Sequence, residues 1–340
     1  MSRRPALLLT LAGALVLRLS TWGHVFSRGR VFIDEPDGYY HLRRAFLALT
    51  TWPWVPQVDP ALNWTRTGLI SWPPLFDGLL ATLAMPFGTA AALERIGALL
   101  PPILGVLQLG VLYALVRRLC NERAALVATL VAAVLPGVVR YTMVGALDHD
   151  PFFELALLVA FYGVASASAA LVAIGLATAM LGWTGAIIAA VLVVLVVLVT
   201  RREEQARAVA LGCAAAALVV APFVLTSVWH GDTFEGLSWL HVASLSGASF
   251  ITSLFSRRTR WLSFASGAAT LFLAPAAVLP FLHGAAYAAG DAPILAMVAE
   301  ARPLMTLLGR FDLWPLLIRF GALPLIAFPV VLLAWRRRQD

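Results

Sequence analysis

The sequence of 340 residues is 61% hydrophobic, whereas a soluble globular domain is ~45–50% apolar, and several of its apolar runs exceed the ~18 residues typical of membrane-spanning helices. Its net charge of +7 comes from arginine alone, since the sequence contains no lysine. The arginines cluster in short loops between apolar runs, a distribution that excludes a nucleic-acid-binding protein. We therefore expect an all-α polytopic membrane protein.

The N-terminal run 6–23 predicts the first membrane-spanning helix. A cleaved signal peptide is the alternative interpretation of this run. No clear small-x-small cleavage site precedes the following loop, which favours an uncleaved span.

Arginine clusters predict the cytoplasmic loops. They lie at 3–4, 117–123, 201–207, 257–260 and 336–338. About ten membrane-spanning helices, with both termini in the cytoplasm, would place every cluster on the cytoplasmic side. These helices are expected at 6–23, 95–116, 124–143, 152–167, 168–182, 184–200, 207–228, 237–255, 262–283 and 317–335. Short crossings such as 168–182 leave a hairpin as the alternative.

The apolar segment 69–87 is not expected to cross the membrane. It contains two prolines and Asp77 near its start, and it is barely long enough to span a bilayer. We expect it to form an external or re-entrant helix within a long first outer loop, 24–94.

The first outer loop contains the sequence FIDEPDGYYHLRRAF. Pro36 and Gly38 are turn residues around Asp37, and a helix is predicted to start near Tyr39. A carboxylate is favoured near a helix N-terminus. Asp37 is therefore either a capping residue or a functional carboxylate.

The loop 144–151 overlaps the segment GALDHDPFFE at 145–154, which sets acidic side chains between two long apolar runs. Charges beside hydrocarbon are costly, so such residues tend to be functional. Asp148 and Asp150 have the spacing to hold a hard divalent cation, which prefers oxygen ligands. Asp150 also precedes a proline suited to a first helical turn, so it is either a helix cap or a ligand. His149 is interpreted as a neighbour, and Glu154 requires a partner such as Arg140 or His149.

A third acidic segment, ILAMVAEARPLM, lies in the outer loop 284–316 and contains Glu300 followed by Arg302. An amphipathic surface helix with a solvated glutamate is the alternative interpretation. The arginine-based topology places Asp37, Asp148 and Glu300 on the same, outer side of the membrane. The two cysteines, Cys120 and Cys213, are expected to form neither a disulfide nor a metal site.

Taken in order, these segments resemble the catalytic subunit of oligosaccharyltransferase in its single-subunit archaeal and bacterial forms. The segments that carry the resemblance are Asp37 with the helix 39–43, SWPPLF at 71–76, the motif at 145–154, the run 170–187 ending LGWTGAI, and 297–300 with 302–304. Together they cover roughly 30–310.

The resemblance implies a GT-C membrane glycosyltransferase that moves a glycan from a polyprenyl-(pyro)phosphate carrier to an acceptor with inversion. It implies a Mg²⁺ or Mn²⁺ ion held by Asp37, Asp148, Asp150 and Glu300, with Asp37, Asp148 and Glu300 as catalytic carboxylates. Asp37 and Glu300 would also contact the acceptor amide, which is a protein asparagine in the family. Arg302 and Arg43 are weaker candidates for contacts to lipid phosphate.

Two departures concern acceptor recognition. No Trp-Trp pair occurs, so the family's Trp-Trp-Asp-Tyr-Gly motif and its soluble C-terminal domain are not expected in this single membrane domain, 1–340. Met297 stands where the family has serine or threonine. The acceptor is therefore a peptide, presented by a separate soluble subunit, or another protein site, a lipid or a glycan.

Three alternatives remain open. They are a GT-C enzyme with a non-peptide acceptor, a transporter or flippase for lipid-linked sugars, and a catalytically inactive relative. A transporter is disfavoured because no inverted repeat is found and the carboxylates gather at one surface. The expected location is the cell's inner (plasma) membrane, with the site on the periplasmic or extracellular side.

Overall fold

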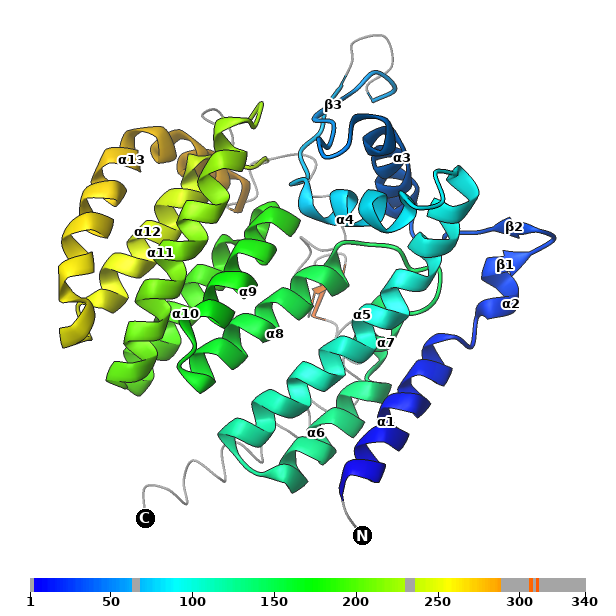
Figure 1. The fold of residues 1–340 in the computed structure, drawn as a ribbon, viewed down its shortest axis with the longest axis horizontal. Coiled ribbons are helices and arrows are strands. Elements are labelled where there is room, and N and C mark those ends of the chain that lie inside the picture. Colours follow the sequence, from blue (N-terminus) through cyan, green and yellow to red (C-terminus); the bar gives the residue numbers. More distant parts are fainter. Residues whose placement is uncertain (1–2, 63–67, 230–235, 289–305, 308–309, 312–340) are drawn as a thin grey trace.

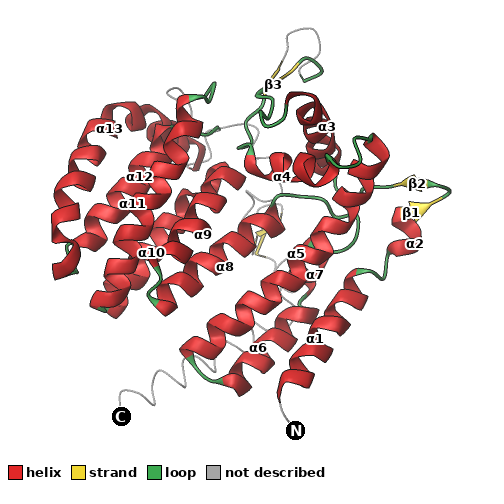
Figure 2. Ribbon diagram, in the orientation of Figure 1, coloured by secondary structure: helices red, strands yellow, loops and turns green. Residues whose placement is uncertain are grey.

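The computed structural model describes residues 3–62, 68–229, 236–288, 306–307 and 310–311. The described chain is mostly helical, as Figure 2 shows, which confirms the predicted all-α fold class. The strands form three short antiparallel hairpins, β1 (Phe26–Ser27) with β2 (Arg30–Val31), β3 (Val58–Asp59) with β4 (Gly68–Leu69), and β5 (Thr306–Leu307) with β6 (Arg310–Phe311).

In the part of the chain that the structure describes, nine helices of at least 13 residues form the helix bundle seen in Figure 1. They are α1 (Arg3–Arg18), α5 (Ala90–Leu119), α6 (Glu122–Val134), α8 (Asp150–Ser166), α9 (Ala169–Gly182), α10 (Ile187–Thr200), α11 (Glu203–Leu225), α12 (Trp239–Ser253) and α13 (Arg260–Ala288). The other elements are α2 (Trp22–Val25), α3 (Pro36–Thr51), α4 (Leu75–Ala84), α7 (Pro136–Tyr141), and the 3₁₀ turns η1 (Thr184–Ala186) and η2 (Arg257–Thr259).

Four helical segments among the described residues are long and apolar enough to cross a membrane: Arg4–Val25, Ala90–Leu119, Glu203–Leu225 and Arg257–Val278. The predicted span 124–143 is divided into α6 and α7, because Pro136 lacks the N–H that would continue the helix. The predicted span 317–335 lies outside the described residues. The count of ten spans and the cytoplasmic termini stay predictions.

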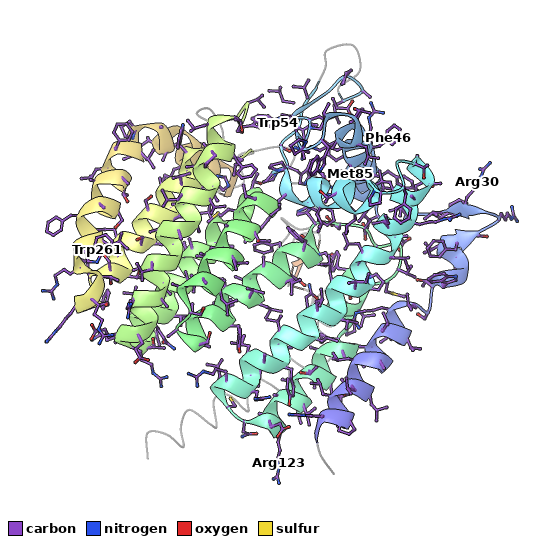
Figure 3. The ribbon with its side chains drawn as sticks, viewed as in Figure 1. Arg30, Phe46, Trp54, Met85, Arg123 and Trp261 are labelled. Atoms are coloured by element: carbon purple, nitrogen blue, oxygen red, sulfur yellow. The ribbon has the colours of Figure 1, made fainter. Side chains whose placement is uncertain are left out.

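The arginine clusters at 117–123, 201–207 and 257–260 lie at the end of the bundle opposite α3 and α4. Figure 1 shows the turns α5–α6, α10–α11 and α12–α13 at one end, and α3, α4 and β3 at the other. Figure 3 likewise places Arg123 opposite Phe46, Trp54 and Met85. Helix α4 has ten residues, so it is only ~15 Å long and does not reach across a ~30 Å hydrocarbon layer.

Small residues set the closest helix contacts in the bundle. A Cβ added to Gly175 of α9 would lie 2.5 Å from the backbone nitrogen of Ala160 in α8. A Cβ on Gly163 of α8 would lie 2.6 Å from the backbone nitrogen of Val172 in α9. Backbones this close are typical of membrane helix interfaces. Cys213 is buried in this bundle and Cys120 is exposed.

A fully buried arginine joins the first helix to the break between α6 and α7. Arg18 of α1 donates to Thr142 Oγ1 at 2.8 Å and to the Ala133 carbonyl at 3.2 Å, near the end of α6. Gly105 of α5 provides the space, since a Cβ there would lie 2.6 Å from Arg18 Nε and 2.7 Å from Thr142 Cβ. The helix break is therefore satisfied by a side chain from another helix.

Gly105→Ala is expected to lower the thermal unfolding midpoint in detergent, because a clash of this kind costs ~1–3 kcal/mol. Gly110→Ala, in the same helix with no atom within 4 Å of its added Cβ, is the matched control. It should leave the midpoint unchanged or raise it, since alanine favours helix over glycine. Equal midpoints for the two variants would show that the Arg18 contact is not tight.

Candidate functional site

The acidic motif loop is fixed to the bundle by backbone hydrogen bonds. Pro102 inside α5 has no N–H, so the carbonyl of Ala98 lacks its helical partner and accepts instead from Gly145 N at 2.9 Å. The carbonyl of Gly145 then accepts from Asp34 N at 2.9 Å. Gly145 has a φ of 85°, a left-handed conformation that suits glycine. The loop is thus tied both to a membrane helix and to the start of the outer loop.

The first turn of α3 packs directly on this loop. A Cβ on Gly38 would lie 2.7 Å from the Leu147 carbonyl oxygen, so only glycine permits this approach. Asp37, the preceding residue, lies in the first turn of α3 with its side chain exposed. The structure therefore brings the two predicted acidic segments together, although they are about a hundred residues apart in sequence.

Nearby acidic residues also shift the pKa of the Glu35 carboxyl. Burial and the charges of Asp148, Asp34 and Asp37 together raise the pKa of the Glu35 carboxyl, although Arg140 opposes this shift from 3.9 Å. A cluster of acids at this end of the bundle is suited to a cationic ligand.

Three side chains in this region are placed to bind a metal ion: His41, Asp148 and His149 each offer one ligand atom, and these atoms lie within 4.8 Å of one another. His149 Nδ1 lies 2.7 Å from Asp148 Oδ1. His41 Nε2 lies 3.4 Å from His149 Nδ1 and 3.9 Å from Asp148 Oδ1. We call these three residues the His-Asp cluster. They come from α3 and from the motif loop.

The cluster favours the ionised form of Asp148. Burial alone would raise the pKa of this carboxyl, but the hydrogen bond and charge of His149, with a further contribution from His41, lower it below its ordinary value. Burial lowers the pKa of His149, but Asp148, with further contributions from Asp150 and Asp77, outweighs that effect and raises it overall. Asp148 is thus an anion in a largely buried position, as a cation ligand requires.

A second, deeper network lies behind His41. His41 Nδ1 is 2.7 Å from Asp77 Oδ1, and Arg44 donates to Asp77 Oδ2 at 2.8 Å. All three side chains are at most 1% exposed. Burial alone would raise the pKa of the Asp77 carboxyl, yet His41 and Arg44 hold it below its ordinary value. Arg44 also donates to the carbonyls of Pro56, Trp72 and Pro73, so it ties α3 to the rest of the outer loop.

The structure places the other predicted residues as follows. Asp150 begins α8, and its Oδ1 lies 3.8 Å from His149 Nε2; no side-chain cap bond is made at this helix end, where His149 occupies the N-cap position. Glu154 Oε2 accepts from Gln108 at 3.1 Å, not from Arg140 or His149 as predicted. Glu300 and Arg302 lie outside the described residues. Asp37 and Asp150 are not among the three clustered ligands, and their roles as ligands stay predictions.

Arg43 is engaged elsewhere in the outer loop. It donates to both oxygens of Asp59, at 2.6 Å and 2.8 Å, and this bidentate hydrogen bond lowers the pKa of the Asp59 carboxyl. A contact from Arg43 to lipid phosphate would compete with this pair. That contact stays a prediction.

An apolar cavity of about 510 Å³ lies between residues of the first outer loop and the end of α11. Four tryptophans contribute to its lining: Trp52, Trp54, Trp72 and Trp229. Arg44 and Trp72 line it too, and the Trp72 ring centroid lies 5.8 Å from that of His41. The cavity therefore shares a wall with the buried network behind the cluster.

Sequence reasoning missed three residues of this site. From the sequence, His149 was interpreted as a neighbour of the site and His41 only as part of a helix. Asp77 was used only as a reason why the segment 69–87 does not cross the membrane. One sequence signal was available. Asp77 and His41 both have apolar and aromatic neighbours in the sequence, which indicates burial, and a buried charge without a partner is costly.

Comparison with known proteins places the fold. The family model described as Oligosaccharyl transferase STT3, N-terminal, matches residues 7–264. Dolichyl-phosphooligosaccharide-protein glycotransferase 2 of Archaeoglobus fulgidus is 28% identical over 311 residues, which cover 88% of this chain and 50% of that relative.

Solved structures agree. The archaeal oligosaccharyltransferase AglB from Archaeoglobus fulgidus, in complex with an inhibitory peptide and a dolichol-phosphate, superposes with a TM-score of 0.82 at 20% identity, covering 99% of this chain and 45% of that one. A structure of the Archaeoglobus fulgidus oligosaccharyltransferase with Zn and sulfate has a TM-score of 0.72 at 18% identity, covering 97% and 43%. At this identity the likeness shows the shared fold, and the chain spans about half the length of the relatives it matches.

Proposed function

The chain belongs to the oligosaccharyl transferase STT3 family, and from this membership we propose that residues 1–340 form a single membrane-embedded GT-C domain that transfers a glycan from a polyprenyl-(pyro)phosphate carrier to a protein acceptor. The relative named above is a dolichyl-phosphooligosaccharide-protein glycotransferase, and the solved AglB structure holds a dolichol-phosphate and a peptide. These names support a lipid-linked donor and a peptide acceptor. We propose that transfer inverts the anomeric carbon.

The observation that carries this proposal is the ionised, largely buried Asp148 beside two imidazoles. The His-Asp cluster fits a divalent cation, because it offers one carboxylate and two ring nitrogens within 4.8 Å of one another. We propose that Asp148 holds the cation together with Asp37, Asp150 and Glu300. A divalent cation bound there would neutralise charge on the leaving phosphate.

The nature of the donor atoms favours one cation over another. Imidazole suits transition metals, whereas Mg²⁺ prefers carboxylate, carbonyl and water oxygens. Because the imidazole of His149 lies beside both Asp148 and Asp150, the site is expected to prefer Mn²⁺ over Mg²⁺. The solved relative with Zn and sulfate is consistent with a transition-metal site in this fold.

The chain's own residues have separate tasks in this proposal. Asp148 carries negative charge at the donor side. Asp37, exposed at the start of α3, and Glu300 contact the acceptor amide. The site faces the end of the bundle opposite the arginine turns, which we assign to the outer face of the inner (plasma) membrane.

The test is glycan release from a labelled donor. Purified protein is incubated with a radiolabelled polyprenyl-pyrophosphate glycan, Mn²⁺ or Mg²⁺, and an acceptor-peptide mixture. Label is expected to leave the lipid, as glycopeptide or free glycan, and faster with Mn²⁺. Label that stays on the lipid under every condition would contradict the transferase assignment and favour transport of the intact lipid-linked sugar.

A further inference from the structure

The strongest geometry outside the proposed ligand set is the buried chain of hydrogen bonds that ends on His41. Arg44 is always protonated, and its pairing with Asp77 at 2.8 Å leaves Asp77 as an acceptor-only carboxylate. His41 Nδ1, 2.7 Å from the other oxygen of Asp77, must then be the N–H donor. In the neutral imidazole the lone pair is on Nε2, which faces the cluster.

The direction of Nε2 is fixed by packing. The His41 ring is 1% exposed and is held by edge contacts to Trp72 and Phe76, with ring centroids 5.8 Å and 5.0 Å away. Its Nε2 lies 3.4 Å from His149 Nδ1, the same atom that contacts Asp148 Oδ1 at 2.7 Å. His149 therefore stands between a fixed acceptor and the carboxylate of Asp148.

We infer that His41 is a positioning residue that fixes the ring of His149 and, through it, the carboxylate of Asp148, with Asp77 and Arg44 setting its tautomer. This inference rests on the proposed function only in treating Asp148 as a cation ligand. Outer partners of this kind orient the groups that bind a metal, and removing one typically lowers metal affinity ~10–100-fold. The chain Arg44–Asp77–His41 begins in the outer loop and ends at the motif loop, so it also makes the site depend on the packing of α3 against α4.

Two substitutions at His41 separate positioning from simple burial. His41→Asn keeps an N–H donor near the position of Nδ1 and so still satisfies Asp77, but it removes the group at Nε2. His41→Gln places its amide near the position of Nε2. His24→Asn, the same change at an exposed histidine of α2, is the matched control.

The readout is Mn²⁺ affinity, measured by electron paramagnetic resonance on the full chain in detergent without donor. His41→Asn should bind Mn²⁺ ~10–100-fold more weakly than wild type at an unchanged thermal midpoint, while His24→Asn is unaffected and His41→Gln recovers most of the affinity. A purely structural role predicts the reverse order, with His41→Asn like wild type and His41→Gln impaired, and that result would overturn the inference. Equal Mn²⁺ affinity in all variants would overturn it too.

The same samples distinguish this inference from the proposed function. A wild-type chain that binds Mn²⁺ with the expected order of variants, yet never releases glycan from the labelled donor, supports the role of His41 and contradicts the transferase assignment. Glycan release with no effect of His41 on Mn²⁺ affinity does the opposite.

Discussion

Asp148→Asn is expected to abolish metal-dependent glycan release, with a loss of at least ~100-fold in rate, because metal assistance is worth several kcal/mol and each ~1.4 kcal/mol is tenfold. The amide keeps the shape of the carboxylate but not its charge. Asp148 is the only member of the His-Asp cluster that is an anion, so no other residue of that cluster replaces it. The rate is measured with the radiolabelled donor and saturating Mn²⁺.

The matched control is Glu94→Gln, which removes one negative charge from an exposed position in the first turns of α5. Its rate should equal that of the wild type. A similar loss in both variants would show that the assay senses net charge or protein quality. An unchanged rate in Asp148→Asn would remove Asp148 from the site.

The second large effect concerns stability of the outer loop. Asp77→Ala is expected to destabilise the packing of α3 on α4 by ~3 kcal/mol, because it leaves Arg44 buried without its carboxylate and His41 without its acceptor. The change in stability is expected to be a loss, because the three carbonyls that still accept from Arg44 carry no full negative charge. Hydrogen exchange of the 36–51 and 75–84 backbone should accelerate about 100-fold.

Asp59→Ala provides the comparison, because it breaks another arginine–aspartate pair in the same loop. Its partner Arg43 is 48% exposed, so water can solvate the guanidinium once Asp59 is removed, although the Asp59 side chain itself is only 2% exposed. Exchange in α3 and α4 should therefore change little. If Asp59→Ala accelerated hydrogen exchange as much as Asp77→Ala, the buried network would contribute no more than the Arg43–Asp59 pair to the packing of α3 on α4.

The overall arrangement was accessible from the sequence because it depends on patterns with a direct physical cause. Arginines at span ends predicted which turns share one end of the bundle, and the turns α5–α6 and α10–α11 do lie opposite α3. The same reasoning placed Asp37 and Asp148 at one end, and Gly38 against Leu147 joins their segments.

The details that were not accessible depend on contacts between distant segments. Asp77 and His41 are 36 residues apart, and only the packing of α4 on α3 makes them partners. His149 was interpreted from the sequence only as a neighbour of the site, whereas in the structure its Nδ1 lies 2.7 Å from Asp148 Oδ1. The break at Pro136 was missed because the run 124–143 is apolar throughout most of its length, and hydropathy does not register a missing N–H.

We propose that Asp148 and its neighbours form one divalent-cation site at the end of the bundle opposite the arginine turns. Its most direct test is a Mn²⁺ titration of purified wild-type and Asp148→Asn protein, followed by electron paramagnetic resonance of free Mn²⁺. We predict one tight Mn²⁺ per wild-type chain, weakly displaced by Mg²⁺ and lost in Asp148→Asn. Wild-type protein that binds no Mn²⁺, or equal Mn²⁺ binding by both proteins, would contradict a divalent-cation site at Asp148.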